Sequence, residues 1–137
     1  MTNEVMLSKL GLVSIFPEMI TAVTDWGVTG RALRDGRCSV EVIDPREFAT
    51  DKHGTVDDRP YGGGPGMVLM PEPLDKAIRS TKADVNVFLT PSGQQLNENI
   101  ISNLLEYESI NLVCGRYEGF DQRILEIHSD YEISIGQ

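Results

Sequence analysis

The chain has 137 residues and a formal net charge of −9; 40% of its residues are hydrophobic and 24% are charged. These proportions are those of a folded domain, and they argue against a disordered or fibrous protein. The length fits one domain with a single core. Domains that grip nucleic acid unaided carry a basic surplus, so a nucleic-acid partner is expected to bind local basic clusters, a dimer groove, or a segment outside this chain.

Nothing in the sequence indicates export or a membrane span. The segment 1–11 contains Glu4 and Lys9 and lacks the apolar core of a secretory signal, and no later apolar run is long enough to cross a membrane. We therefore expect a cytoplasmic protein without membrane contact. Cys38 and Cys114 lie in apolar, strand-like contexts without metal-ligand spacing, so we predict two buried thiols rather than a disulfide or a metal site.

The first half of the chain predicts two strands and two short helical segments. The apolar run 11–16 predicts a buried strand, followed by a helix from Pro17 to about Thr24. One or two helical turns are expected over 29–36, and a second strand over 38–43. The polar connection 44–66 has a length that usually signals function or mobility.

The second half alternates more regularly between helix and strand. A helix is predicted over 71–81, with Leu74, Ala77 and Ile78 forming its buried stripe. The remaining predicted elements are a strand over 85–89, a turn over 90–93, a helix over 96–106, a strand over 110–114, a helix over 121–127 and a strand over 131–135. This alternation predicts an α/β fold, with a mostly parallel sheet and ligand sites at the carboxyl ends of its strands.

A loop rich in glycine and proline is the strongest local signal. Residues 59–66 hold four glycines and two prolines, a composition that predicts an irregular loop with exposed amide groups. A plain surface turn is the alternative, but Asp57, Asp58, Arg59 and Tyr61 in and beside the loop favour a binding site. The loop lacks the lysine and the following helix of a phosphate-binding loop, which argues against nucleoside triphosphate binding.

Three strand exits are expected to meet in one crevice: residues 90–93, 115–119 and 135–137. Each contains glycine or proline, so main-chain groups could bind the edge of a planar heterocycle. Leu89 and Ile135 could sandwich its faces, and adenine would fit. The alternative is that these are ordinary turns between strands and helices.

Few side chains in the chain suit nucleophilic or metal chemistry. His53 and His128 are far from each other and from cysteine, so we predict two surface groups and no metal site. No serine lies in a nucleophile elbow, and neither cysteine lies in an electropositive motif. Arg116 and Glu118 remain, as groups that could orient a base or assist a proton transfer; a solvated loop pair is the alternative.

Five motifs occur in order along the chain from Gly11 onward, namely Ile15–Met19, Asp25–Arg31, Thr55–Met67, Leu112–Gly119 and Ser134–Gly136. In these motifs the chain resembles the bacterial tRNA (guanine)-methyltransferase TrmD family. The resemblance implies a SPOUT-type (alpha/beta knot) fold with helices on both faces of the sheet, and a homodimer. It also implies an extension over 1–10 and an N-terminal methyltransferase domain over 11–137, with the C-terminal tRNA-binding domain absent and the trefoil knot incomplete if the chain ends at Gln137.

The resemblance also implies an activity: methyl transfer from S-adenosylmethionine to ring nitrogen 1 of the guanine 3′ of the tRNA anticodon. The implied tRNA contacts are Arg59, Tyr61, Gly62, Gly63 and Gly64, with Arg116 and Glu118 in supporting catalytic roles. The implied cofactor contacts are Phe88, Leu89, Thr90, Pro91, Gly115, Tyr117, Glu118, Gly119, Ile135, Gly136 and Gln137.

The chain departs from the family pattern at its last residue. The family continues after Ser134-Ile135-Gly136 with an aspartate, an aromatic residue and a glycine-rich run, whereas this sequence has Gln137 and stops. The resemblance implies that the principal general base is an aspartate from the segment after the third cofactor loop. We therefore expect the main base to lie beyond Gln137, and this piece alone to be inactive or nearly so. The resemblance also implies a magnesium ion in the full-length enzyme. Two alternatives stay open: a non-catalytic dimerisation or RNA-binding module, and a generic nucleotide-binding domain.

Overall fold

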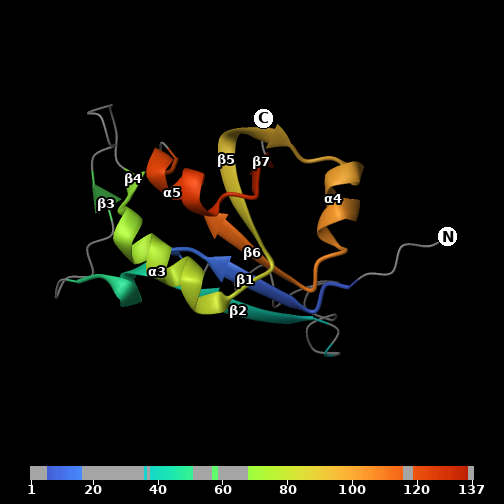
Figure 1. The fold of residues 1–137 in the computed structure, drawn as a ribbon, viewed down its shortest axis with the longest axis horizontal. Coiled ribbons are helices and arrows are strands. Elements are labelled where there is room, and N and C mark those ends of the chain that lie inside the picture. Colours follow the sequence, from blue (N-terminus) through green and yellow to red (C-terminus); the bar gives the residue numbers. More distant parts are fainter. Residues whose placement is uncertain are drawn as a thin grey trace.

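A computed structural model describes residues 6–16, 36, 38–50, 57–58, 68–115 and 119–135 (Figure 1). Its main sheet has the strand order β2-β1-β6-β5-β7, and all four pairings are parallel. The strands are β1 (Lys9–Val13), β2 (Ser39–Ile43), β5 (Val85–Gln95), β6 (Ser109–Cys114) and β7 (Tyr131–Ser134), and the α-helices are α3 (Pro71–Thr81), α4 (Glu98–Leu104) and α5 (Gln122–His128). The predicted α/β fold with a mostly parallel sheet is confirmed.

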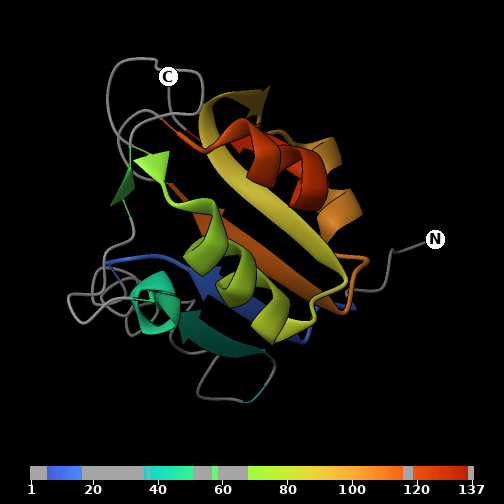
Figure 2. The same ribbon diagram turned by 60° about the vertical axis from the view of Figure 1, so that its left-hand side comes forward.

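Helices α3 and α5 cover one face of the sheet (Figure 2). Helix α3 begins at Pro71 and ends before Lys82, which is left-handed (φ 52°). Its predicted stripe of Leu74, Ala77 and Ile78 is buried, as expected for an amphipathic helix. We call this the closed face; its buried core consists of Val13, Ile15, Ile43, Leu74, Ala77, Ile78, Phe88, Val113 and Ile124.

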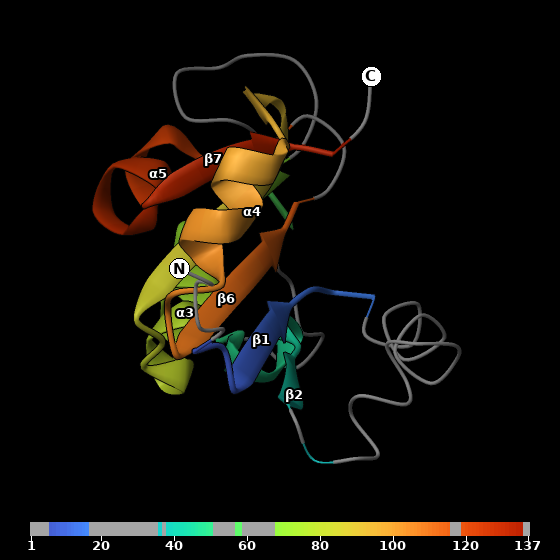
Figure 3. The same cartoon turned by 90° about the vertical axis from the view of Figure 1, so that its right-hand side faces the viewer.

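Helix α4 lies on the opposite face of the sheet, and Figure 3 shows this helix in front. Its Ile100 packs with the strand residues Val85, Val87, Ile110 and Ile133. We call this the α4 face. Helices on both faces of the sheet therefore match the prediction.

Two predicted boundaries in this region were wrong because β5 is longer than the apolar run suggests. Leu89 and Gln94 both pair with Ile133, so the chain bulges over 90–93 and then resumes pairing as far as Gln95. Helix α4 consequently begins only after Asn97, whose side chain accepts a hydrogen bond from the Ile100 amide at 2.9 Å. The expected turn at 90–93 is thus a bulge within one strand.

The first strand also differs from its prediction. β1 covers Lys9–Val13, whereas an apolar strand over 11–16 was expected. The Ser14 amide still bonds to the Ile43 carbonyl at 3.0 Å, but the Ser14 hydroxyl then accepts the Phe16 amide at 3.0 Å and ends the extended pairing. Hydrogen bonding by the serine, rather than apolar content, sets this end.

Three shorter elements occupy the described parts of the connection after β2. A 3-10 helix η1 (Pro45–Phe48) follows Asp44, whose carboxylate accepts the Arg46 amide at 2.9 Å. Strands β3 (Asp57–Asp58) and β4 (Val68–Leu69) pair antiparallel in a separate sheet. The helices predicted over 17–24 and 29–36 and the glycine-rich loop 59–66 lie outside the described residues, apart from Gly36.

The structure also tests the expectations about the two cysteines and about a membrane-spanning segment. Cys38 and Cys114 are free and only partly buried, so the prediction of buried thiols was too strong. Burial still raises the pKa of both thiols. In the part of the chain that the structure describes, no helix has the length and apolar character needed to cross a membrane.

Candidate functional site

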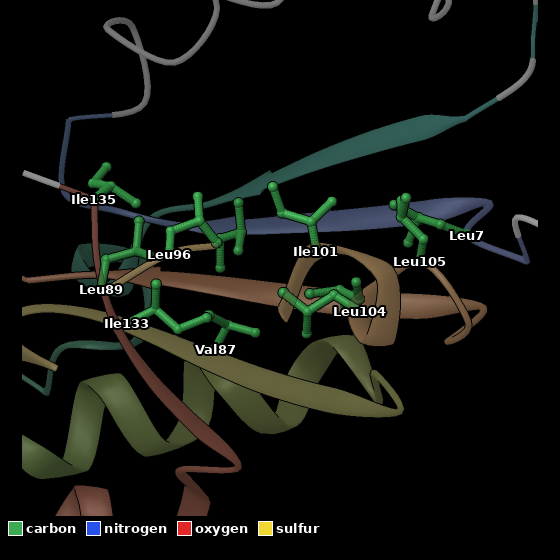
Figure 4. A pocket seen from close by; sticks show the side chains of 11 residues that line it. Leu7, Val87, Leu89, Leu96, Ile101, Leu104, Leu105, Ile133 and Ile135 are labelled. Atoms are coloured by element: carbon green, nitrogen blue, oxygen red, sulfur yellow. The ribbon is translucent and has the colours of Figure 1, made fainter. Parts of the chain in front are cut away.

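An apolar groove of about 300 Å³ runs along the α4 face (Figure 4). Its lining residues come from β5, β6, β7, α4 and the segments beside them, and all are leucine, isoleucine or valine: Leu7, Val87, Leu89, Leu96, Ile101, Leu104, Leu105, Ile110, Leu112, Ile133 and Ile135. Leu96, Ile101 and Ile135 remain exposed to 38%, 43% and 69%. Contiguous exposed apolar side chains of this kind mark a binding surface.

Leu89 and Ile135, the two residues predicted to sandwich a heterocycle, both line this groove. Figure 4 shows them near one end of it, with Leu96 close by. Parallel pairing brings them there, because Leu89 faces Ile133 across β5 and β7 and Ile135 follows two residues later. This end of the groove offers apolar contact to the faces of a flat ring.

The first predicted turn, over 90–93, lies directly beyond Leu89. Thr90 is buried, and its Oγ lies 3.2 Å from the Ser92 hydroxyl, whereas Pro91 is exposed. A Cβ on Gly93 would lie 2.6 Å from the backbone of Glu132 and Ile133, so only glycine allows this approach to β7. The bulge is therefore fixed against the strand that leads to Ile135.

The second predicted turn begins at Gly115, immediately after β6. Gly115 is exposed, whereas Gly119 is buried with φ 114°, a conformation that favours glycine. Phe88 does not reach the groove with its side chain, because the ring is fully buried in the closed-face core. Its ring makes an edge contact with Phe120 instead, with centroids 4.8 Å apart and planes at 82°.

Several predicted site residues lie outside the described part of the chain. These are the tRNA-contact candidates Arg59, Tyr61, Gly62, Gly63 and Gly64, the catalytic candidates Arg116 and Glu118, and the cofactor candidates Tyr117, Gly136 and Gln137. Of the predicted site residues that the structure describes, Leu89 and Ile135 alone line the groove.

A chain of buried polar side chains supports the strands from the closed face, and no sequence pattern predicted it. Asn111 is 1% exposed, and its amide nitrogen donates to the Thr81 hydroxyl and to the Asn86 side-chain oxygen at 2.9 Å. Asn86 in turn donates to the His128 carbonyl at 3.2 Å. These bonds tie β5 and β6 to the ends of α3 and α5, at the edge of the sheet opposite the turns.

His128 is not the surface group that was predicted. Its side chain is 8% exposed, and its Nε2 lies 2.5 Å from Asp75 Oδ1 on α3. Burial raises the pKa of Asp75, but hydrogen bonds from His128 and Arg79 outweigh burial and leave that pKa below its ordinary value. The pair links α3 to α5; within the described ranges, no cluster of three histidine, cysteine or acidic side chains could hold a metal ion.

The amino-acid sequence matches a known protein family over nearly its whole length. Residues 8–137 match the family described as tRNA (Guanine-1)-methyltransferase TrmD. The chain belongs to the TrmD family. The motifs at 112–119 and 134–136 on which the sequence resemblance rested thus fall within the match, and their described residues include the end of β6, both glycines of the second turn and Ile135.

Known tRNA methyltransferases are similar to this chain over nearly its whole length. A tRNA (guanine-N(1)-)-methyltransferase of Shewanella sediminis is 50% identical over 133 residues, covering 93% of this chain and 55% of the relative. The same enzyme of Klebsiella pneumoniae is 49% identical, covering 93% and 52%. The chain therefore spans about half the length of the curated relatives it matches.

A solved structure shows the same fold. The crystal structure of tRNA (m1G37) methyltransferase from Aquifex aeolicus matches with a TM-score of 0.81 and 38% identity, over 96% of this chain and 61% of that one. The expected SPOUT-class α/β fold is thereby confirmed.

Proposed function

We propose that this chain is the methyl-donor-binding part of a tRNA (guanine-N1)-methyltransferase. One observation carries the proposal: within a chain of this family, Leu89 and Ile135, from two of the three implied cofactor turns, line a common apolar groove. The relatives that it matches are named for this activity. Only about half of their length is represented here, so the proposal concerns one part of the reaction.

S-adenosylmethionine fits the arrangement of the described residues. Leu89 and Ile135 would hold the faces of its adenine, and main-chain groups of residues 90–93 and 115–119 would bind the polar edges. When bound, the cofactor supplies an electrophilic methyl group. The protein's contribution is to hold donor and acceptor in a reactive orientation, which accounts for much of the rate enhancement in such transfers.

Guanine nitrogen 1 carries a proton that a base must remove as the methyl group arrives, an effect worth roughly 10²- to 10⁴-fold. We propose that Arg116 and Glu118 assist and that the principal base comes from the region that the relatives carry beyond the match. We also propose that Arg59, Tyr61 and Gly62–Gly64 contact the anticodon region of tRNA and that the protein is a cytoplasmic homodimer. We propose that the magnesium ion of the full-length enzyme binds outside the described residues, among which no cluster of three histidine, cysteine or acidic side chains could hold it.

The experiment compares two proteins: the 137-residue chain, and a chimera that continues after Gln137 with the unmatched part of the Shewanella sediminis relative. Calorimetry with S-adenosylmethionine and with ATP, followed by transfer of labelled methyl groups to tRNA, measures binding and chemistry separately. The substrate carries guanine 3′ of the anticodon, and the control transcript carries adenine there.

We expect both proteins to bind S-adenosylmethionine in preference to ATP, and only the chimera to methylate the guanine transcript. A short chain that gives no cofactor heat would support the non-catalytic alternative, and equal ATP affinity would support the nucleotide-binding one. Robust turnover by the short chain would show that the placement of the base is wrong.

A further inference from the structure

Phe120, which sequence analysis did not single out, contacts residues at the first and second of the three implied cofactor turns. It follows Gly119 at the end of the second turn and is partly buried against the closed-face core. Its ring makes the edge contact with Phe88 at 4.8 Å. The same ring fills the space beside Gly115, where a Cβ would lie 2.9 Å from Phe120 Cζ and 3.0 Å from Cε2.

These two contacts lie where β5 and β6 reach the site. Phe88 pairs with Val113, and Leu89 pairs with Cys114, so the first turn starts beside Gly115. Phe88 is fully buried and therefore fixed by close packing. The Phe120 ring contacts both Phe88 and the space beside Gly115. Because Phe88 is fixed, the ring restricts where the main chain of Gly115 can lie.

The contact also explains why residue 115 is glycine. Its backbone is not in the left-handed region, so alanine would meet no backbone restriction there. The nearest atoms to an added methyl group are those of the Phe120 ring. Glycine at 115 thus lets the ring lie against the main chain of the second turn.

We propose that Phe120 is a positioning residue of the S-adenosylmethionine site, holding the starts of the two turns at a fixed separation before the cofactor binds. The inference rests on the function proposed above, because it concerns the same site. Phe120 lies among the closed-face residues and is not in the groove lining, so it acts through Gly115 and Phe88. Turns that are already in place lose less conformational freedom on binding, which raises affinity.

The first test replaces the ring in the 137-residue chain by Phe120→Leu. The matched control is Phe48→Leu in η1, since Phe48 is also partly buried against the same core. Urea unfolding measures stability and calorimetry measures affinity for S-adenosylmethionine. We expect comparable losses of stability, but an affinity loss of about tenfold for Phe120→Leu and less than about twofold for Phe48→Leu. Equal affinity of a folded Phe120→Leu and the wild type would overturn the inference and leave the proposed function standing.

The second test keeps the ring and adds a methyl group by Gly115→Ala. Affinity should fall by a similar factor, and the double variant Gly115→Ala/Phe120→Leu should lose less than the product of the two single losses, because the collision disappears with the ring. Multiplicative losses would show that the two residues act independently and would overturn the inference. The single variant Gly115→Ala keeps the inference testable even if Phe120→Leu does not fold, because a folded Gly115→Ala chain with wild-type affinity would overturn it.

A measurement without cofactor separates this inference from the proposed function. In the ligand-free chain, the Phe120 ring should shift the NMR signals of Gly115, and Phe120→Leu should move the signals of residues 89–93 as well as those of Gly115 and Gly119. A wild-type chain that binds no S-adenosylmethionine would refute the proposed function, and these spectra would then decide the coupling alone. Unchanged signals over 89–93 would overturn it.

Discussion

The two faces of the sheet differ in how the described residues cover them. On the closed face, α3 and α5 bury Val13, Leu74, Phe88 and Val113 completely. On the α4 face, a helix of seven residues leaves a groove with exposed leucine and isoleucine side chains. Parallel sheets are normally covered on both sides.

The difference assigns separate tasks to the two faces. Substitutions in the closed face should change the free energy of unfolding, because close-packed side chains there have no room to adjust. Substitutions of the exposed groove residues Leu96, Ile101 and Ile135 should change ligand affinity and leave stability nearly constant. Phe120 is the exception that links the two, since it packs in the closed face and contacts the turns.

The largest expected effect is that of Leu74→Ala in the closed face. Leu74 is 0% exposed, and removal of a fully buried leucine side chain costs about 2–5 kcal/mol. Leu96→Ala makes the same chemical change at a groove residue that is 38% exposed, and it should cost less than about 1 kcal/mol. Urea unfolding of both variants measures the two losses of free energy. Equal losses would show that the two faces do not differ in their contribution to stability.

A smaller effect is expected for Gly11→Ala, which tests the packing around the buried amide. The added methyl group would collide with Asn111 Oδ1, and overpacking of this kind costs about 1–3 kcal/mol. In an Asn111→Ala background the same change should cost much less, because the colliding atom is gone. If the cost is unchanged in that background, Asn111 is not the obstacle.

Next is the cap of α5. Asp121 is 3% exposed, its carboxylate accepts the Arg123 amide at 2.9 Å, and it pairs with the Arg123 guanidinium at 2.7 Å. Asp121→Ala should therefore cost about 1–2 kcal/mol in thermal or urea unfolding. Asp121→Asn, which retains a cap acceptor, should cost less.

Low pH should reduce the stability that this cap contributes, because Asp121 becomes protonated. Hydrogen bonding from Arg123 lowers the pKa of Asp121 below its model-compound value of 3.8 in spite of burial. A depressed carboxyl pKa contributes stability that is full well above pH 3.8 and is lost as the pH falls through the folded-state value. Between pH 6 and pH 2, the free energy of unfolding should therefore fall less steeply for Asp121→Asn than for the wild type. Parallel curves of this free energy against pH would contradict the role given to Asp121.

The smallest effect on stability is expected for Ile135→Ala in the groove. Its side chain is 69% exposed, so unfolding should change little, whereas affinity for S-adenosylmethionine should fall about tenfold through lost apolar contact. Ile127→Ala is the matched control, because Ile127 is 63% exposed and does not line the groove. A similar affinity loss in both variants would mean that the groove does not bind the cofactor.

Periodicity predicted the fold well where one signal dominated. Helix α3 was predicted over its full span because proline at its start and the spacing of Leu74, Ala77 and Ile78 agree. The course of β5 beyond Leu89 could not be predicted, because pairing of Gln94 and Gln95 with β7 depends on tertiary contact rather than on composition. The burial of His128 was missed for the same reason, since Asp75 lies 53 positions away.

The candidate site was predictable in part. The rule that parallel strands present ligands at their carboxyl ends brought Leu89 and Ile135 together correctly. It could not show that Phe88 points into the closed face, because neighbouring strand residues alternate sides and an apolar run does not reveal which side is which. Phe120 was overlooked because its partner Phe88 lies on β5, far from it in the sequence, and their contact depends on tertiary packing.

The most direct test of the central claim is a titration of the 137-residue chain, labelled on isoleucine and leucine methyl groups, with S-adenosylmethionine by NMR. The account predicts that the signals of Leu89, Leu96 and Ile135 shift together and saturate, while those of Ile78 and Leu74 in the closed face stay in place. Saturable shifts confined to closed-face methyl groups, with the groove signals unmoved, would contradict it.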